Sequence, residues 1–340
     1  MQIHNDMTKI NSYQELQKLF AAPEKTPAGV PFGNPPNLPT FEESKIIVYG
    51  VPFDDTATFG KGCERGPEAL RHTSARQIET YVIDEKVDIY EKHNIFDLGD
   101  LKIKGKLTDK ERQALQDHSD VKAVHKKLQG IMSQLSVIEE INRFIMSKGK
   151  IPLLIGGEHT LSYWPLRAAA SDGRKPFVIH FDAHSDAKET YMDMDLCHTT
   201  PMFHFLKESH ADFVQIGIRQ ADKQEIDFAR EQKVRIIAPA ELRNNFGAVK
   251  KWLSEKTKER NVYITFDIDV LDICYTPCTG TPEPFGLHPE EIVEMFKAIH
   301  PTARLVGADL MEVSVKNNDY REGTIAVQLL LRLFAREYVR

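Results

Sequence analysis

The chain has 340 residues, of which 41% are hydrophobic and 28% are charged, so it is long enough to bury a large core in one globular domain. Its net charge of -6 and its lack of a long basic run argue against nucleic acid and an anionic membrane surface as partners, and are compatible with a small cationic substrate. The polar amino-terminal sequence lacks the apolar core of a signal peptide, and no apolar stretch predicts a transmembrane helix. We therefore expect a cytoplasmic protein.

Four cysteines, Cys63, Cys197, Cys274 and Cys278, are too few for a disulfide scaffold in a chain of this length, so we expect free thiols. Cys274 and Cys278 lie four residues apart, but Pro277 between them argues against a shared helical face. No second Cys or His pair with zinc-type spacing accompanies them.

The amino-terminal region is unusually rich in proline. Residues 26–40 read TPAGVPFGNPPNLPT, and five prolines and two glycines in this stretch are incompatible with regular secondary structure. We expect residues 1–44 to form an arm or linker and residues 45–340 to form a single domain.

Seven apolar runs rich in Val and Ile follow the arm. They are KIIVYGV (45–51), IPLLIGG (151–157), FVIHFDAH (177–184), DFVQIGI (212–218), VRIIAP (234–239), NVYITFDIDV (261–270) and RLVGADLMEV (304–313). Their continuous apolarity predicts strands buried on both faces, as a parallel sheet requires. Between them, residues 120–150 carry apolar side chains at three- and four-residue spacing, and residues 65–81 place Pro67 and Glu68 in a predicted first helical turn. The alternation predicts a three-layer α/β/α domain with a mostly parallel central sheet.

Ionisable side chains follow four of these runs, at the points where buried strands should end. They are Glu158 and His159 after the run at 151, Asp182, His184 and Asp186 after the run at 177, Asp267 and Asp269 in the run at 261, and Glu312 in the run at 304. Loops at the carboxyl ends of parallel strands converge, so we expect these groups on one rim of the sheet.

The spacing of these residues predicts a metal centre. In an extended segment alternate residues face the same side, so each Asp-rich motif can point at one place. Four aspartates gathered there would repel one another unless cations neutralise them. Carboxylates and imidazoles without a thiolate favour Mn²⁺ over structural zinc, with Ni²⁺ or Co²⁺ tolerating the same ligands, and bridging carboxylates can hold two ions.

A simpler interpretation exists for each residue taken alone, because an Asp or His at a strand end is more often a cap or a satisfied buried polar group. The combination favours the metal centre. The histidines His180, His204, His210 and His288 are expected to be core, surface or capping residues.

The motifs GGEHT, FDAHSD, FDIDVLD, TGTPEP and MEV occur in the order and spacing of the ureohydrolases, the manganese enzymes that include arginase and agmatinase. The resemblance spans about residues 45–338 and is strongest to agmatinase. It implies an arginase-like fold with a central sheet of about eight strands, a ureohydrolase catalytic domain at 45–340, and a homotrimer or homohexamer.

The resemblance also implies roles for individual residues. The ligands of two Mn²⁺ ions would be His159, Asp182, His184, Asp186, Asp267 and Asp269. Asp182 and Asp267 would bridge the ions, and a bridging hydroxide, oriented by Asp186, would attack the guanidinium carbon and release urea and an amine. Glu312 would bind the guanidinium, and His198 would contact substrate and shuttle protons.

The substrate is less narrowly defined. The stretch ETYMDMDLCH is most similar to agmatinases, and Asp193 and Asp195 in it would attract an amine, which favours hydrolysis of agmatine to putrescine and urea, a step of polyamine biosynthesis. The segments LDICYTPCTGTPEPFG and MEVSVKNND depart from the agmatinase pattern. They leave guanidinobutyrate, arginine or free guanidine open as substrates. Hydrolysis of formiminoglutamate is a separate alternative. A histone-deacetylase-like amidohydrolase with one zinc ion and a non-catalytic binding protein are the alternatives of other classes.

Overall fold

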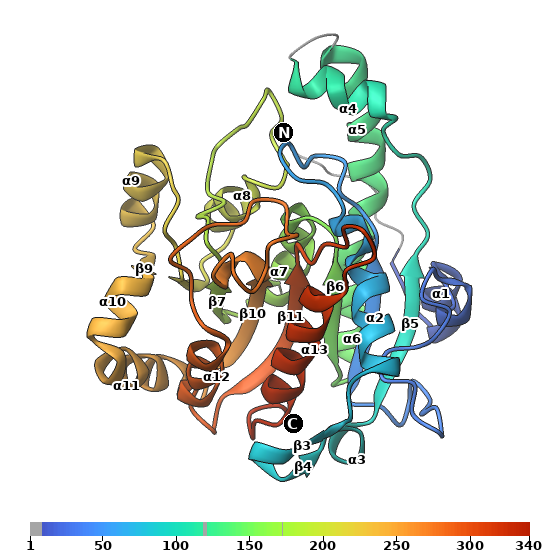
Figure 1. Cartoon of the computed structure of the whole chain (residues 1–340), viewed down its shortest axis with the longest axis vertical. Helices are drawn as coiled ribbons and strands as arrows, with labels where there is room; N and C mark the ends of the chain where they lie inside the picture. Colours follow the sequence, from blue (N-terminus) through green and yellow to red (C-terminus); the bar gives the residue numbers. More distant parts are fainter. Residues whose placement is uncertain (1–8, 118–120, 172) are drawn as a thin grey trace.

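The computed structural model describes residues 9–117, 121–171 and 173–340, which form one large sheet with helices on both sides (Figure 1). The sheet has nine strands in the order β1-β5-β2-β6-β11-β10-β7-β8-β9, and β3 pairs with β4 separately. Neighbouring strands of the large sheet are parallel, except that β1 runs antiparallel to β5. The predicted three-layer α/β/α fold is confirmed, with nine strands where about eight were expected.

The strands are β1 Phe20–Ala21, β2 Ile46–Val51, β3 Tyr81–Val82, β4 Val87–Asp88, β5 Ile95–Leu101, β6 Ile151–Gly156, β7 Phe177–Phe181, β8 Asp212–Ile216, β9 Arg235–Ile237, β10 Asn261–Asp267 and β11 Arg304–Met311. The α-helices are α1 Tyr13–Lys18, α2 Gly66–Arg76, α3 Ile89–His93, α4 Asp109–Gln116, α5 Val121–Leu135, α6 Val137–Ser147, α7 Tyr163–Ala170, α8 Pro201–Glu208, α9 Lys223–Glu231, α10 Pro239–Asn244, α11 Phe246–Thr257, α12 Pro289–Ala298 and α13 Arg321–Phe334. Short 3-10 helices are η1 Pro23–Lys25, η2 Cys63–Arg65, η3 Ile83–Glu85, η4 His159–Ser162 and η5 Ile268–Val270.

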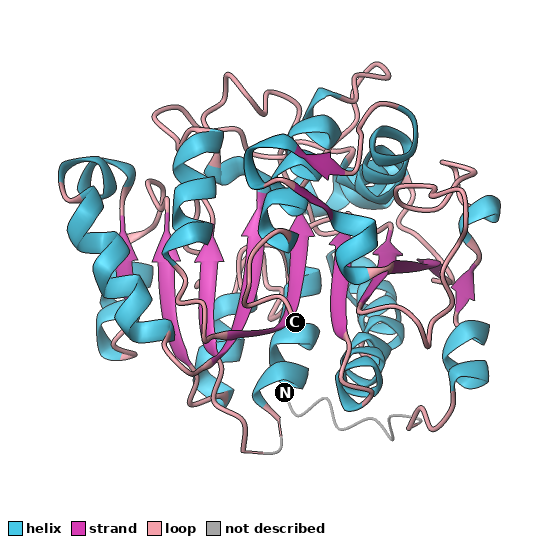
Figure 2. Ribbon diagram, turned by 90° about the horizontal axis from the view of Figure 1, so that it is seen from below, coloured by secondary structure: helices cyan, strands magenta, loops and turns pink. Residues whose placement is uncertain are grey.

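The continuous apolar runs arise because the sheet is covered on both faces. In β2, Ile46 and Val48 enter one apolar cluster, whereas Ile47 and Tyr49 enter the other. The first cluster lies under α2, α11, α12 and α13, and the second under α6, α7 and α8 (Figures 1 and 2). Successive strand residues point to opposite faces, so both sets must be apolar.

Strand β5 was not predicted because Asp97 and Asp100 interrupt its apolar pattern. Both acids are compensated inside the core by Arg71 of α2. The Arg71 guanidinium is fully buried, and its Nε lies 2.7 Å from Asp97 Oδ2 while its Nη1 lies 2.5 Å from Asp100 Oδ1. A buried charge is tolerated when it is paired and hydrogen-bonded, so the strand keeps its place in the sheet.

Part of the predicted amino-terminal arm packs on the domain. Phe20 of β1 pairs with Leu101 of β5, and the backbone N–H of Phe32 donates to Asp97 Oδ2 at 2.8 Å. Residues 26–40 contain no helix or strand, as their prolines predict. Residues 1–8 lie outside the described residues, and a boundary at residue 44 remains a prediction.

Both predicted helical regions are helical, with one difference. The helix expected over residues 120–150 is two helices, α5 and α6, with Ser136 between them, and residue 120 lies outside the described residues. The second is α2, and Pro67 and Glu68 lie in its first turn as predicted. The structure describes all four cysteines, and each is free. Within the described residues, no helix has both the length and the apolarity needed to cross a membrane.

Candidate metal and substrate site

The four central strands β6, β11, β10 and β7 are neighbours in the sheet and end at the same edge (Figure 1). His159 begins η4 just after β6, and Asp182 directly follows β7. Asp267 is the last residue of β10 and pairs in register with Met311 of β11, which Glu312 follows. The sheet therefore brings together the residues that the sequence placed at four separate strand ends.

His159 lies at the centre of a first group of acids. Its Nδ1 is 2.9 Å from Asp182 Oδ2, 3.1 Å from Asp186 Oδ2 and 3.3 Å from Asp267 Oδ2. Nδ1 is buried, yet among the described residues it has no partner with hydrogen-bond geometry. Its Nε2 faces Thr265 Oγ1 at 3.0 Å, which fixes the ring with Nδ1 towards the carboxylates.

His184 defines a second, overlapping group. Its Nδ1 is 2.9 Å from Asp269 Oδ2 and 3.6 Å from Asp182 Oδ1. Asp182, His184 and Asp269 offer ligand atoms that all lie within 4.8 Å of one another, and His159, His180 and Asp182 do the same. Because Asp182 belongs to both groups, its two oxygens can serve two neighbouring cations.

The clustering opposes simultaneous ionisation of the acids. Burial raises the pKa of Asp267 well above its ordinary value, and the charges of Asp269 and Asp182 raise it further. Burial and the charge of Asp182 raise the pKa of Asp186 to about 7. Desolvation alone would lower the pKa of His159, but the carboxylates of Asp182, Asp186 and Asp267 raise it well above 6.5. Positive charge placed among these groups would relieve the repulsion.

The acids converge through loops rather than through the extended segments expected from their spacing. Strand β7 ends at Phe181, and Asp186 has a left-handed φ of 49°. Asp269 lies in η5, where its backbone N–H donates to Asp267 Oδ1 at 2.8 Å. Glu312 is also left-handed, with a φ of 62°. Such torsions are uncommon outside glycine and persist where the surrounding structure imposes them, often at functional sites.

From the sequence we expected His180 to be a core, surface or capping residue, and the structure adds a contact. His180 is fully buried on β7, and its Nε2 lies 2.8 Å from Asp182 Oδ2. Its Nδ1 lies 3.1 Å from Nε2 of Gln215 on β8. His180 precedes Asp182 by two residues, so the period of a strand was a signal that both point the same way.

Glu158 links the loop after β2 to the histidine expected to move protons. Its fully buried carboxylate accepts hydrogen bonds from the backbone N–H groups of Thr56 and Ala57 at 2.8 and 2.9 Å, and from the Thr160 hydroxyl at 2.5 Å. The Thr56 hydroxyl in turn accepts from the backbone N–H of His198 at 3.0 Å. The sequence placed Glu158 on the expected rim of the sheet without assigning it a role, and it gave no signal for Thr56.

A cavity of about 250 Å³ opens above the acids. Its lining includes five of the predicted site residues, His184, Asp186, His198, Asp267 and Glu312. His159, Asp182 and Asp269 are buried, each 1% exposed or less. All eight predicted residues therefore belong to one centre and its cavity.

Glu312 is held at the cavity wall by a hydrogen bond from the backbone. Its Oε1 accepts the backbone N–H of His159 at 2.9 Å, and a Cβ at Gly280 would come within 3.2 Å of Oε2. The absence of a side chain at Gly280 thus leaves room beside that oxygen. Burial and the charge of Glu158 raise the pKa of Glu312 to about 8, so a cation in the cavity would favour its ionised form.

The outer part of the cavity carries more acidic than basic groups. Lys188 lines it but forms ion pairs with Asp222 and Glu225, and Glu283 lies 3.8 Å from His184 Nε2. Asp193 and Asp195, expected to attract the substrate amine, are exposed and do not line this cavity. Any preference for a cationic tail must therefore come from Glu283 and the acids beside Lys188.

The arginase family matches the chain over residues 44–335. The agmatinase of Bacillus anthracis is 32% identical over 286 residues, covering 81% of this chain and 86% of that protein. The proclavaminate amidinohydrolase of Streptomyces clavuligerus is 31% identical over 275 residues, covering 79% and 80%. Among solved structures, the agmatine ureohydrolase of Thermoplasma volcanium has a TM-score of 0.72 at 25% identity, with 96% of this chain and 98% of that chain covered.

Proposed function

The chain belongs to the arginase family and is a ureohydrolase or amidinohydrolase, and on that premise we propose that it hydrolyses agmatine to putrescine and urea at a dinuclear Mn²⁺ centre. The observation that carries the proposal is the convergence of four aspartates and two histidines beneath a cavity whose wall contains Glu312. Agmatine is favoured because agmatinases are among the curated relatives and because the cavity has an excess of acids.

The side chains fit divalent cations. The donors are carboxylate and imidazole groups without a thiolate, and the buried Nδ1 of His159 is left without a partner of hydrogen-bond geometry among the described residues. We propose that two Mn²⁺ ions would be held by His159, Asp182, His184, Asp186, Asp267 and Asp269. Such ions, when bound, supply Lewis acidity and lower the pKa of bound water. Ni²⁺ or Co²⁺ fits the same donors.

Glu312 is proposed to bind and orient the guanidinium. Its Oε2 faces the space beside Gly280, and a planar carboxylate suits the paired N–H groups of a guanidinium. The hydrogen bond from the His159 backbone holds the other oxygen, so the carboxylate is fixed before substrate arrives. The substrate carbon would thereby lie over the acids of the metal centre.

His198 is proposed to pass the proton that the leaving amine requires. It lines the cavity, and desolvation, with the charges of Lys61 and His184, lowers its pKa to about 3. At neutral pH the imidazole is therefore neutral, and it could pass a proton only when the bound substrate or a nearby negative charge raises that pKa towards neutrality. Thr56 and Thr58 lie 3.4 Å from its two ring nitrogens and limit its orientation.

A guanidino compound with a carboxylate tail, arginine or 4-guanidinobutyrate, is the second candidate. The observation that favours it is Lys188, a cation in the cavity wall. Its pairing with Asp222 and Glu225 weakens that case, because the lysine charge is already neutralised. Assembly as a homotrimer or homohexamer remains a further prediction.

The test is urea release by the Mn²⁺-loaded protein with agmatine, arginine, 4-guanidinobutyrate and free guanidine, repeated with Ni²⁺ and Co²⁺. We expect agmatine to give the highest kcat/KM. A higher value for either carboxylate compound would replace agmatine by the second candidate. Absence of urea from all four substrates, with two metal ions bound per chain, would overturn the proposed reaction.

A further inference from the structure

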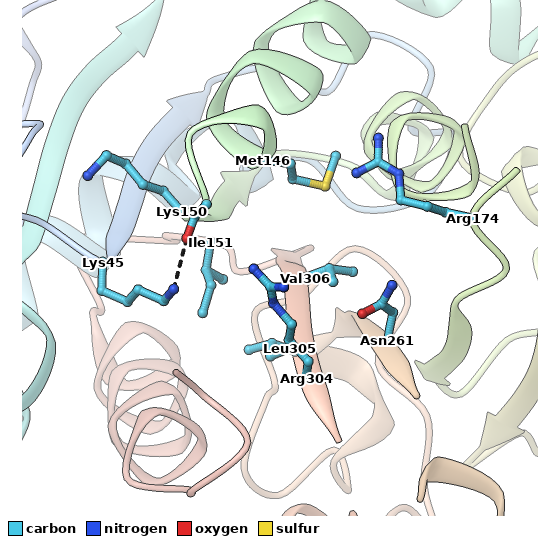
Figure 3. A pocket seen from close by; sticks show the side chains of 10 residues that line it. Lys45, Met146, Lys150, Ile151, Arg174, Asn261, Arg304, Leu305 and Val306 are labelled. Atoms are coloured by element: carbon cyan, nitrogen blue, oxygen red, sulfur yellow. Dashed lines mark hydrogen bonds between the residues drawn. The ribbon is translucent and has the colours of Figure 1, made fainter. Parts of the chain in front are cut away.

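A second cavity, of about 170 Å³, lies at the amino ends of the central strands, whereas the acidic centre lies at their carboxyl ends. Figure 3 shows the side chains that line it. It is bounded by the amino ends of three central strands, because Ile151 begins β6, Asn261 begins β10 and Arg304 begins β11. Lys45, the residue before β2, completes this rim. The same strands thus carry acids at their carboxyl ends and polar or cationic side chains at their amino ends.

The charge of this cavity is one-sided. Lys45, Lys150, Arg174 and Arg304 line it, and no carboxylate is among the described residues of its lining. The chain as a whole has a net charge of -6, so a lining with four positive and no negative side chains differs from the average charge of the protein. Like charges held close together cost free energy, and a bound anion would reduce that cost.

Two of the cavity's side chains retain unused donors. Within the described residues, the Arg304 guanidinium and the Asn261 amide have no side-chain hydrogen bond or ion pair. Figure 3 shows the Arg304 guanidinium between the Lys45 ammonium and the Asn261 amide. Lys45 Nζ donates to Gly149 O at 2.8 Å, which anchors the ammonium beside the cavity. Burial, then the charges of Arg304 and Lys150, lower the pKa of Lys45, consistent with mutual proximity of these cations.

Lys150 contacts the backbone of the amino-terminal arm and does not point into the cavity beside Arg304. Its Nζ donates to the backbone carbonyls of Glu42 and Ser44 at 2.8 and 2.7 Å, and Figure 3 shows it directed away from Arg304. It fastens the end of the amino-terminal arm and contributes its charge at longer range. The donors available to a ligand are therefore those of Lys45, Asn261 and Arg304.

We propose that this cavity is a binding site for a small phosphate-type oxyanion, either inorganic phosphate or a small phosphate monoester. A guanidinium presents paired N–H donors that match the oxygens of a phosphate, while an ammonium and an amide supply single donors. The cavity is below the roughly 300–1,000 Å³ of sites for drug-sized ligands, so it suits one phosphate group with at most a small substituent. The site is independent of the proposed ureohydrolase chemistry.

Calorimetric titration tests the proposal, with inorganic phosphate and glycerol 2-phosphate added separately to the metal-loaded protein. The variants are Arg304→Gln and Lys45→Gln, with Lys251→Gln as a control that removes one charge from an exposed position outside the cavity. We expect Arg304→Gln and Lys45→Gln each to weaken binding at least tenfold, and Lys251→Gln to leave it unchanged. All three should release urea at the wild-type rate, because none lies at the acidic centre.

The two ligands distinguish the sources of the phosphate. Binding of inorganic phosphate alone assigns the site to the free ion, and binding of both admits the monoester. Equal dissociation constants in the wild type and in Arg304→Gln would overturn the proposal, because phosphate would then bind elsewhere, including at the metal centre. Failure of the wild type to bind either compound at millimolar concentration would also overturn it. Arg304 is exposed, so thermal unfolding of Arg304→Gln should match that of the wild type and exclude misfolding.

Discussion

The hydroxyl of Thr56 accepts a hydrogen bond at 3.0 Å from the backbone N–H of His198, 142 residues later in the chain. The same hydroxyl donates to Glu158 Oε1 at 2.5 Å. Thr56 thus connects a buried carboxylate beside the acidic centre to the loop that carries His198. We regard Thr56 as a positioning residue, because it acts on His198 rather than on the substrate.

Replacing Thr56 by valine should lower kcat by about tenfold, since an unsatisfied buried donor costs roughly 1–3 kcal/mol and His198 would shift to find another partner. KM and the bound metal should stay near wild-type values. Thr56→Ser keeps the hydroxyl and should restore most of the activity. Steady-state kinetics with metal analysis on both variants checks this, and equal kcat values for valine and serine would show that the hydrogen bond does not position His198.

Asp267→Asn should abolish activity and lower the metal content together. The substitution keeps the size of the side chain but removes one of the charges around His159 Nδ1, which lies 3.3 Å from Asp267 Oδ2. Metal analysis after dialysis and urea release measure the two effects on one sample. The exposed Asp195→Asn is the matched control and should change neither. Full activity of Asp267→Asn would contradict a dinuclear centre that uses this residue.

Arg71→Met should lower the free energy of unfolding by about 3–5 kcal/mol, because it leaves Asp97 and Asp100 buried without their counter-charge. Equilibrium unfolding in urea gives the value. Arg230→Gln removes an arginine that is exposed and should change stability by less than about 0.5 kcal/mol. A loss below 1 kcal/mol in Arg71→Met would mean that the aspartates find other partners.

His93 should make the folded state sensitive to acid. Burial, with the nearby charges of Lys92 and Lys45, lowers its pKa below 6.5, although its hydrogen bond to the Phe334 carbonyl at 2.7 Å opposes this. The unfolded chain then binds the proton more readily, so the stability His93 contributes is present above pH 6.5 and is lost as the pH falls through the folded-state pKa. His93→Gln keeps a donor for Phe334 but cannot titrate. The difference in unfolding free energy between wild type and variant should therefore shift against the wild type between pH 7 and pH 5, and a constant difference would refute the assignment.

The parts of the fold that could be predicted were those that depend on residues close together in the sequence. The apolar runs located seven strands, and the rule that ligands gather at their carboxyl ends located Asp182 and Asp267. The conformation of Asp186 could not be predicted, because an extended segment was the natural reading of its spacing and the left-handed turn is imposed by tertiary contacts.

Long-range pairing accounts for most of the remaining differences. Strand β5 was not predicted because Asp97 and Asp100 can be buried only when Arg71 neutralises them. Arg71 precedes them by 26 and 29 residues, so no local pattern shows this pairing. The second cavity could not be predicted either, since Lys45, Asn261 and Arg304 lie at the amino ends of three separate strands and form no motif. Asp193 looked suited to the substrate amine by sequence proximity, but its loop places it outside the cavity.

The left-handed backbones of Asp186 and Glu312 have an evolutionary consequence. Glycine or asparagine would adopt these torsions at lower cost, so a selection for thermal tolerance alone would tend to exchange both residues. Each exchange would remove a carboxylate from the acidic centre. A gain in thermal stability at either position would therefore lower the catalytic rate. Adaptation of this enzyme to high temperature would therefore have to keep the carboxylates at these two positions.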